Sequence, residues 1–265
     1  MKLKITHTSQ YVYDSPVSYG LQQVRLTPMK TPQQTVQEWH VDVEGGQIEC
    51  RFQDQHHNDV LLVKAAKGAE EVRFTAHGVV ETKDTNGVLG KVYGVAPLWH
   101  FLQPTPRTAP GKHIRKLAKG LDKAEDKLSA LHALSAAILD AVPYSKTGTE
   151  AGTTADEAVA LGQGVCQDHA QIFIAAARHA GVPARYVSGY LMMNDRVDQD
   201  ASHAWAEAHL DGLGWVGFDV SNGISPDERY VRIATARDSK EASPISGMRL
   251  GNSKESMIVS LQVQQ

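Results

Sequence analysis

The chain has 265 residues, of which 42% are hydrophobic and 22% are charged, a composition typical of folded globular proteins rather than disordered or fibrous ones. Its net charge of −3 provides no basic field for nucleic acid or for an anionic membrane surface. The first residues alternate between polar and apolar, and no apolar run approaches the roughly 18–20 residues of a membrane span. Two cysteines far apart in sequence favour free thiols, so we expect a cytoplasmic protein without nucleic-acid or membrane partners.

Short β-type segments fill the first third of the chain. Each combines polar–apolar alternation with β-branched or aromatic residues, and Gly, Pro, Asn and Asp separate them. The segments are Lys2–Thr8, Tyr19–Leu26, Val36–Val43, Gln47–Phe52, Asp59–Val63 and Glu71–Val80. This spacing predicts an antiparallel β-sandwich over residues 1–85.

A proline-rich stretch follows the β region. The prolines at positions 97, 104, 106 and 110 break the pattern, and residues 86–125 are therefore the expected junction between two domains. The second domain is expected over residues 126–265. It opens with apolar residues at helical spacing from Leu128 to Val142.

Two further helices and four strands are expected in the second domain. Thr154 and Glu157 fit a capping box for a helix that ends at Gly162, and the next helix starts near Cys166 and stops before Pro183. Strands are expected at Ala184–Met192, His203–Leu210, Trp215–Val220 and Met257–Val263. Residues 229–253 carry many charged, Ser and Pro residues and are expected to form a loop.

Cys166 is the strongest chemical signal in the sequence. It follows a turn with Gly162 and Gly164 and opens a helix, where unpaired N–H groups and the helix dipole stabilise a thiolate. The same N–H groups could hold an oxyanion, and the glycines allow a substrate backbone to approach closely. The alternative is that Cys166 is a small buried apolar residue, as most free cysteines are.

His203 and Asp219 complete the chemical order expected of a nucleophile, its base and the group that orients the base. They lie 37 and 53 residues after Cys166. If the turn at residues 211–214 forms a hairpin, paired residue numbers sum to roughly 424–426, and an even sum puts Asp219 on the face of His203. A slip of one residue would separate them. Each alone could instead be structural, as a core histidine and a turn-forming carboxylate.

Taken together, these segments resemble the transglutaminase-like superfamily of papain-type thiol enzymes, and within it the bacterial transglutaminase-like proteins described as cysteine proteases. The β-rich first part resembles the N-terminal region of those proteins. Two departures are Val220, where proline is common, and His169, where an aromatic is common. The resemblance rests on Gly164-Val165-Cys166-Gln167-Asp168, on Pro183 to Tyr190, on Ser202 to Glu207, on Gly214 to Asp219 and on Asp227 to Val231.

The resemblance implies an α+β fold in which an N-terminal antiparallel β-sandwich precedes a papain-like domain, with the nucleophile helix packed on an antiparallel sheet. It implies that Cys166 is the nucleophile, His203 the base and Asp219 the orienting acid. The expected reaction is hydrolysis of a peptide or isopeptide bond through a thioester, without a metal or organic cofactor. Transfer to an amine and a non-catalytic module that binds a peptide or partner remain alternatives. The oligomeric state stays open.

Other residues are expected around this site. Gly164, Gln167, Asp168, Trp205 and Tyr144 are candidates for contacts with the substrate or with the catalytic side chains. Asp168 could instead cap the helix, and Trp205 could be a core aromatic. His169, three residues after Cys166, has a spacing that could share a metal with it. Cys50 is expected to be buried, unpaired and structural.

Overall fold

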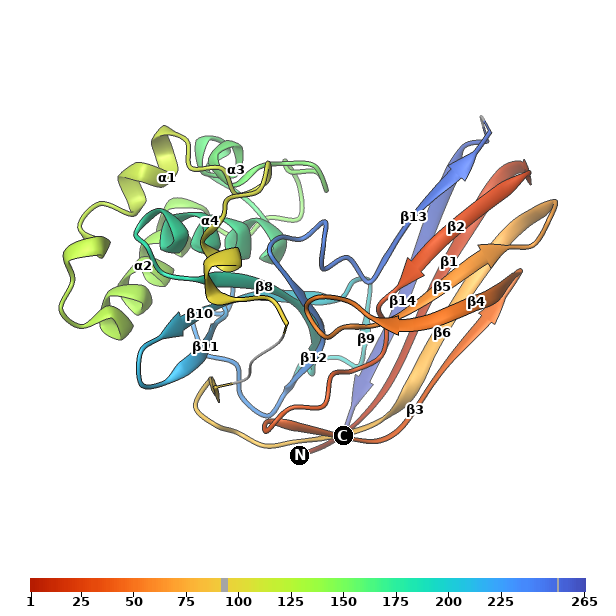
Figure 1. Cartoon of the computed structure of the whole chain (residues 1–265), viewed down its shortest axis with the longest axis horizontal. Coiled ribbons are helices and arrows are strands. Elements are labelled where there is room, and N and C mark those ends of the chain that lie inside the picture. The colour runs from red at the N-terminus through yellow and green to blue at the C-terminus, as the bar shows by residue number, and fades with distance from the viewer. Residues whose placement is uncertain (92–94, 252) are drawn as a thin grey trace.

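A computed structural model describes residues 1–91, 95–251 and 253–265. Helices gather at one end of the molecule and long strands extend from the other (Figure 1). Three sheets run in the orders β3-β6-β1-β14-β9, β13-β2-β5-β4 and β12-β8-β10-β11-β7. Neighbouring strands in all three sheets are antiparallel, so the fold is a mixed α and β structure with antiparallel sheets.

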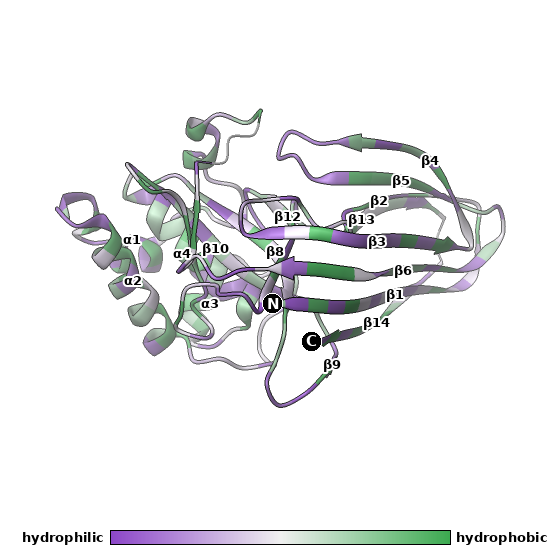
Figure 2. Ribbon diagram, turned by 90° about the horizontal axis from the view of Figure 1, so that it is seen from below, coloured by the Kyte–Doolittle hydropathy of each residue, from purple (hydrophilic) through white to green (hydrophobic). Residues whose placement is uncertain are grey.

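Two of the sheets pack face to face as the expected sandwich. Side chains along β1 alternate between exposed and buried, and the buried ones meet residues such as Leu61 and Val63 of the second sheet in one core. Green and purple alternate along these strands in Figure 2. The bounds are β1 Lys2–Val17, β2 Tyr19–Val24, β3 Gln34–Glu44, β4 Gly46–Gln53, β5 Asp59–Ala65, β6 Ala69–Thr82, β9 Asp198–Gln199, β13 Ile245–Leu250 and β14 Glu255–Gln264.

The last two strands return to the sandwich. β14 lies beside β1, with pairs from Lys4↔Gln264 to Tyr13↔Glu255, and β13 lies beside β2. The expected second domain over residues 126–265 therefore contributes its final strands to the sheets of the first. The expected loop over residues 229–253 is also wrong, because β12 and β13 both fall within it; residue 252 lies outside the described residues.

The third sheet and the helices form the other half of the molecule. Helix α4 packs on one face of this sheet, against the small side chains of Ala204, Ala206 and Ala208 on β10. The strands are β7 Val88–Gly90, β8 Ala184–Leu191, β10 His203–Leu210, β11 Gly214–Phe218 and β12 Tyr230–Ala236. The helices are η1 Leu98–Leu102, α1 Lys112–Leu117, η2 Leu121–Lys123, α2 Lys127–Ala141, α3 Ala155–Leu161 and α4 Cys166–His179. The expected junction at 86–125 thus contains β7 and three short helices, while residues 92–94 lie outside the described part.

The hairpin of β10 and β11 has one of the even registers that the sequence allows. Ala206 pairs with Phe218 and Leu210 with Gly214, so paired residue numbers sum to 424. His203, Trp205 and Glu207 therefore share the sheet face opposite to helix α4.

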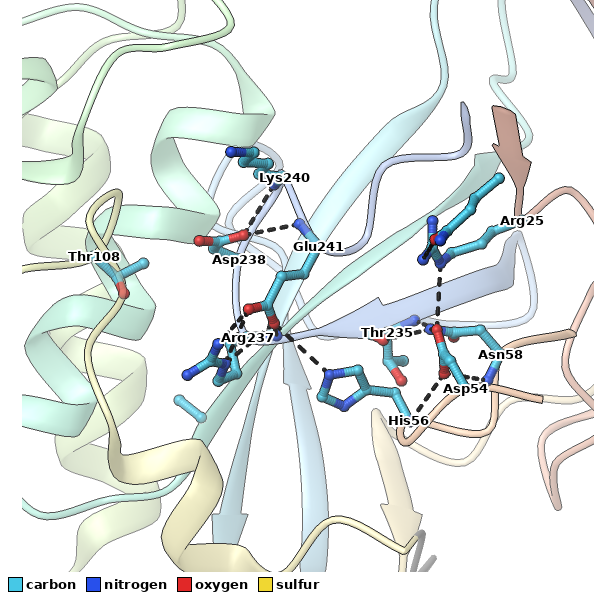
Figure 3. Close-up of polar contacts among 12 residues, drawn as sticks. Arg25, Asp54, His56, Asn58, Thr108, Thr235, Arg237, Asp238, Lys240 and Glu241 are labelled. Carbon is cyan, nitrogen blue, oxygen red and sulfur yellow. Dashed lines mark hydrogen bonds and ion pairs between the residues drawn. The ribbon is translucent and has the colours of Figure 1, made fainter. Parts of the chain in front are cut away.

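A loop of the sandwich contacts the end of β12 and the segment that follows it (Figure 3). Asn58 donates to the Thr235 carbonyl at 2.8 Å and accepts from the Thr235 N–H at 2.8 Å. Two residues away, His56 Nε2 lies 3.7 Å from Glu241 Oε2. These buried polar contacts fix the sandwich against the third sheet.

Two further findings concern the chain as a whole. Cys50 is unpaired but exposed on β4, so the expectation that it is buried is wrong. Strand β4 packs against the core through residues other than Cys50. Among the described residues, no helix has the length and apolar character needed to cross a membrane.

Candidate active site

The turn before helix α4 presents Cys166 at the helix start. Gly162 ends α3 with a left-handed φ of 67°, which glycine adopts without strain. Asp168 accepts hydrogen bonds from the Val165 N–H at 2.9 Å and from the Thr149 hydroxyl at 2.7 Å. A Cβ at position 164 would lie 2.8 Å from the Asp168 Cβ, so this tight cap requires Gly164. Asp168 and Gly164 hold the turn that carries the thiol.

His203, which begins β10, and Asp219, which directly follows β11, form a buried pair. His203 Nε2 lies 2.6 Å from Asp219 Oδ2. The carboxylate also accepts from the Tyr230 hydroxyl at 2.7 Å and from Asn222 Nδ2 at 2.7 Å. The Asn222 N–H donates to the other oxygen at 3.2 Å. Because four donors surround Asp219, its orientation is fixed, and so is that of the imidazole.

The pKa values of this pair favour its charged form. Burial raises the pKa of Asp219, but the hydrogen bond and positive charge of His203 outweigh burial, with help from Asn222 and Tyr230, and the pKa is lowered overall. For His203, burial lowers the pKa, while Asp219 and then Cys166 raise it, to about 10. The arrangement thus stabilises an imidazolium at His203 beside the Asp219 carboxylate.

A cleft of about 530 Å³ opens over the cysteine and the histidine. It is lined by charged as well as apolar groups, including Lys146, Arg196 and Asp200 from the rims. Gln167 and Tyr144 also line it, as expected, and half of the Tyr144 surface is exposed. The thiol is therefore accessible from solvent along a surface that carries both charged and apolar groups.

Trp205 lies behind His203 and not in the cleft. Only 2% of its surface is exposed, and its ring centre lies 6.4 Å from that of His203 and 5.4 Å from that of Tyr230. Gly164 and Asp168 likewise do not line the cleft. Trp205, Gly164 and Asp168 therefore support the site from inside the protein. This agrees with the alternatives that Trp205 is a core aromatic and that Asp168 caps the helix.

Both ring nitrogens of His169 lie within hydrogen-bonding distance of partners inside the protein. Its Nδ1 lies 2.8 Å from the Ser221 hydroxyl and its Nε2 lies 2.7 Å from the Val142 carbonyl. The ring thus ties α4 to two neighbouring segments. Among the described residues, no three His, Cys, Asp or Glu side chains are grouped as a metal site would require.

Four residues of the site were not singled out from the sequence. Tyr230 and Asn222 hold Asp219, while Tyr186 and Ser188 of β8 line the cleft. The turn sequence after Asp219 was a signal for Asn222, since Asx side chains often bond to nearby backbone or side chains. Nothing local marks Tyr230, which reaches Asp219 only through the pairing of β12 with β8.

A cysteine at a helix start that faces a histidine held by an aspartate is the arrangement found in thiol enzymes. Comparison with known families agrees. A model of the transglutaminase-like superfamily matches residues 115–220, and a model of the bacterial transglutaminase-like N-terminal region matches residues 3–81. The chain belongs to the transglutaminase-like superfamily, in the bacterial group that carries this N-terminal region.

Several relatives are similar over different lengths. An uncharacterised protein of Mycobacterium leprae is 26% identical over 275 aligned positions, which cover 99% of this chain and 98% of the relative. An uncharacterised protein of Mycobacterium tuberculosis is 34% identical over 141 positions, or 49% of this chain and 45% of the relative. A crystal structure described as a candidate cysteine protease from Cytophaga hutchinsonii is 26% identical, with a TM-score of 0.78, over 100% of this chain and 91% of that one.

Proposed function

We propose that the protein hydrolyses a peptide or isopeptide bond, with Cys166 as nucleophile, His203 as acid and base, and Asp219 as the group that orients His203. The observation that carries the proposal is the 2.6 Å contact between His203 Nε2 and the buried Asp219 Oδ2, beside a cleft that His203 and Cys166 both line. A helix-borne thiol facing a strand-borne His–Asp pair is the papain-like arrangement that the resemblance implies.

The reaction follows from the charges of the site. The Cys166 thiolate attacks the carbonyl carbon, and the C–N bond breaks as the His203 imidazolium gives its proton to the leaving amine. This leaves a thioester on the sulfur. Neutral His203 then takes a proton from the water that attacks the thioester. The C–S bond breaks, and the acid product leaves with Cys166 again a thiolate and His203 again an imidazolium. Asp219 keeps the proton-bearing nitrogen turned toward itself throughout.

The start of α4 supplies a place for the oxyanion. Backbone N–H groups in the first turn of a helix have no partner within the helix. Those of Cys166 and Gln167 lie beside the thiol and would donate to the developing negative charge. The cleft is open to solvent and carries charged groups, which supports water as the second reactant, in preference to a bound amine.

The first experiment compares the two cysteines on a panel of peptide and isopeptide amides, with hydroxylamine added as an alternative acceptor. Cys166→Ala should abolish turnover and leave the fold intact, because the thiol is at the edge of a cleft and its removal leaves little cavity. Cys50→Ala is the matched control, and since Cys50 is exposed, turnover and stability should both stay unchanged. If the Cys166→Ala variant retained turnover, the proposal that Cys166 is the nucleophile of an enzyme would be refuted.

Chemical labelling separates the enzyme from a non-catalytic binding module built on the same scaffold. Iodoacetamide at mildly acidic pH should label Cys166 much faster than Cys50, although both are accessible, because only Cys166 has an imidazolium beside it. Mass spectrometry of peptides assigns the label to each cysteine. Equally slow labelling of the two would favour the binding module. Hydroxamate products in the presence of hydroxylamine would instead favour amine transfer.

A further inference from the structure

A second cavity, of about 110 Å³, lies on the sheet face opposite to helix α4. Loops of the sandwich close over it, including the loop that carries His56 (Figure 3). Two arginines, Arg185 on β8 and Arg232 on β12, line it together with apolar side chains. The cavity is separate from the cleft of Cys166, and none of its lining residues belongs to that cleft.

The two arginines share a single carboxylate. Arg185 Nε donates to Glu207 Oε2 at 2.7 Å, and the guanidinium of Arg232 contacts the other Glu207 oxygen. All three side chains are more than nine-tenths buried, with exposed fractions of 9%, 4% and 1% for Arg185, Arg232 and Glu207. The group therefore carries one positive charge more than its carboxylate balances.

Several guanidinium hydrogens have no protein acceptor. Within the described residues, the Nε–H of Arg232 is buried without a hydrogen-bond partner, and Arg185 is hydrogen-bonded only through its Nε. Each guanidinium has five N–H donors. Burying a charge and its donors without partners is unfavourable in general, and a bound anion removes that penalty.

The walls of the cavity indicate which anion fits. More than half of the lining residues are apolar, among them Met29, Leu98 and Phe101, and Trp215 lies under Arg185 with 4.0 Å between the guanidinium carbon and the ring centre. The exposed residue His57 lies at the rim of the cavity, so the cavity can be reached from solvent on that side. The volume accommodates a few waters or one small molecule. The site thus has a cationic end and an apolar body.

We propose that this cavity binds a small organic carboxylate with an apolar body, and that Arg232 and Arg185 hold its carboxylate. Planar guanidinium groups donate pairs of parallel hydrogen bonds to carboxylates, so the two free donor sets match this head group. An inorganic anion would satisfy the charge but would leave the apolar walls without contacts. The assignment does not depend on the reaction at Cys166.

Butyrate is the probe, and its neutral isostere butyramide is the control for shape. In wild-type protein at constant ionic strength, butyrate should raise the thermal midpoint in a saturable way. The rise should reach about 5–10 °C when butyrate stands at 100 times its dissociation constant. Calorimetric titration measures that constant directly. Butyramide, chloride and phosphate should give no saturable shift. A phosphate shift equal to that of butyrate, or a butyramide shift of that size, would overturn the carboxylate assignment.

Arg232→Met tests the site itself, since it leaves Arg185 and Glu207 as a neutral pair and should abolish butyrate binding. Arg229→Met is the matched control, because Arg229 is a partly exposed arginine nearby that pairs with Asp227 instead, and it should bind butyrate normally. If Arg232→Met does not fold, Arg232→Lys keeps the charge but not the planar fork and should bind about 10-fold or more weakly. Normal butyrate binding by a folded Arg232 variant would overturn the proposal.

Discussion

At the scale of single residues, Asp219 has two structural tasks at once. Its carboxylate closes the turn through Asn222 and at the same time holds His203 Nε2. The two interpretations that the sequence left open, turn former and partner of the histidine, therefore both describe the residue. A carboxylate fixed from two sides cannot rotate away from the imidazole when a substrate binds.

Asp219→Asn should keep the thiol and the fold but lower kcat, because an amide can donate to the imidazole and favours the wrong tautomer. In serine enzymes the corresponding loss is about 10⁴-fold. Steady-state kinetics on the best substrate of the panel measures it. Asp227→Asn is the control, since Asp227 pairs with Arg229 outside the cleft. Wild-type kcat in Asp219→Asn would remove Asp219 from the mechanism.

The raised pKa of His203 predicts how stability depends on pH. His203 titrates near 6.5 when unfolded and near 10 when folded, so its protonated form stabilises the fold fully below about pH 6.5, and this contribution is lost as pH rises toward 10. Since Asp219 is the main cause of the raised pKa, wild type should melt above Asp219→Asn by a margin that shrinks between pH 6.5 and 10. Thermal melts across that range test this. If the difference in melting temperature between the two proteins did not change over this pH range, the ion pair of His203 and Asp219 would be contradicted.

At this scale the sequence predicted the three residues that the structure brings together at the cleft, but not Tyr230 and Asn222, which hold Asp219. Cys166, His203 and Asp219 stand out because a turn, a strand start and a hairpin register are local patterns. Tyr230 has a donor role that depends on which strand lies next to β8, and a single sequence does not give that. Cys50 was misjudged because alternation predicts a strand but not which of its faces is covered, and Cys50 sits beside the break in register between Ile48 and Cys50.

At the scale of elements, the contact of α4 with β10 sets the distance between thiol and imidazole. Alanines on β10 let the helix lie close to the sheet, and Ala206 is fully buried there. The sequence predicted both elements and their faces, because helical and alternating periods are strong over these residues. It missed β12, whose charged residue Arg232 reads as loop but is paired with Glu207 across the sheet.

Ala206→Leu should destabilise the protein by about 1–3 kcal/mol, because the larger side chain overpacks the seam between helix and sheet. It should also lower turnover per folded molecule by moving Cys166 away from His203. Ala160→Leu on the exposed side of α3 is the control and should change stability by less than about 0.5 kcal/mol. Chemical denaturation gives both values. Equal stability of the two variants would show that the seam tolerates expansion.

At the scale of the whole molecule, the sandwich is built from both ends of the described chain. β14 lies between β1 and β9, and the N and C ends lie close together in Figure 1. The sequence predicted β1 and β14 as strands, but not β9, and it placed β14 with the second domain. Strand partners far apart in the chain depend on the assembled core, and local alternation carries no information about them.

Leu261→Ala should cost about 2–4 kcal/mol of stability, because the side chain is 1% exposed in the core shared by both sheets. Ile258→Ala on the same strand is the matched control, since Ile258 is 59% exposed, and it should change stability by less than about 0.5 kcal/mol. Denaturant titration measures both. Similar costs for the two variants would mean that β14 does not complete the core as described.

The pairing of β1 with β14 determines the order in which a nascent chain can mature. β1 is translated before the other described elements and β14 after them, so the central ladder of the sandwich closes only late in synthesis. Until then β1 offers an open hydrogen-bonding edge on that side, which other chains can occupy. Closing such a long-range ladder is slow compared with forming helices. The ribosome-bound chain is therefore open to mispairing along β1 during this interval.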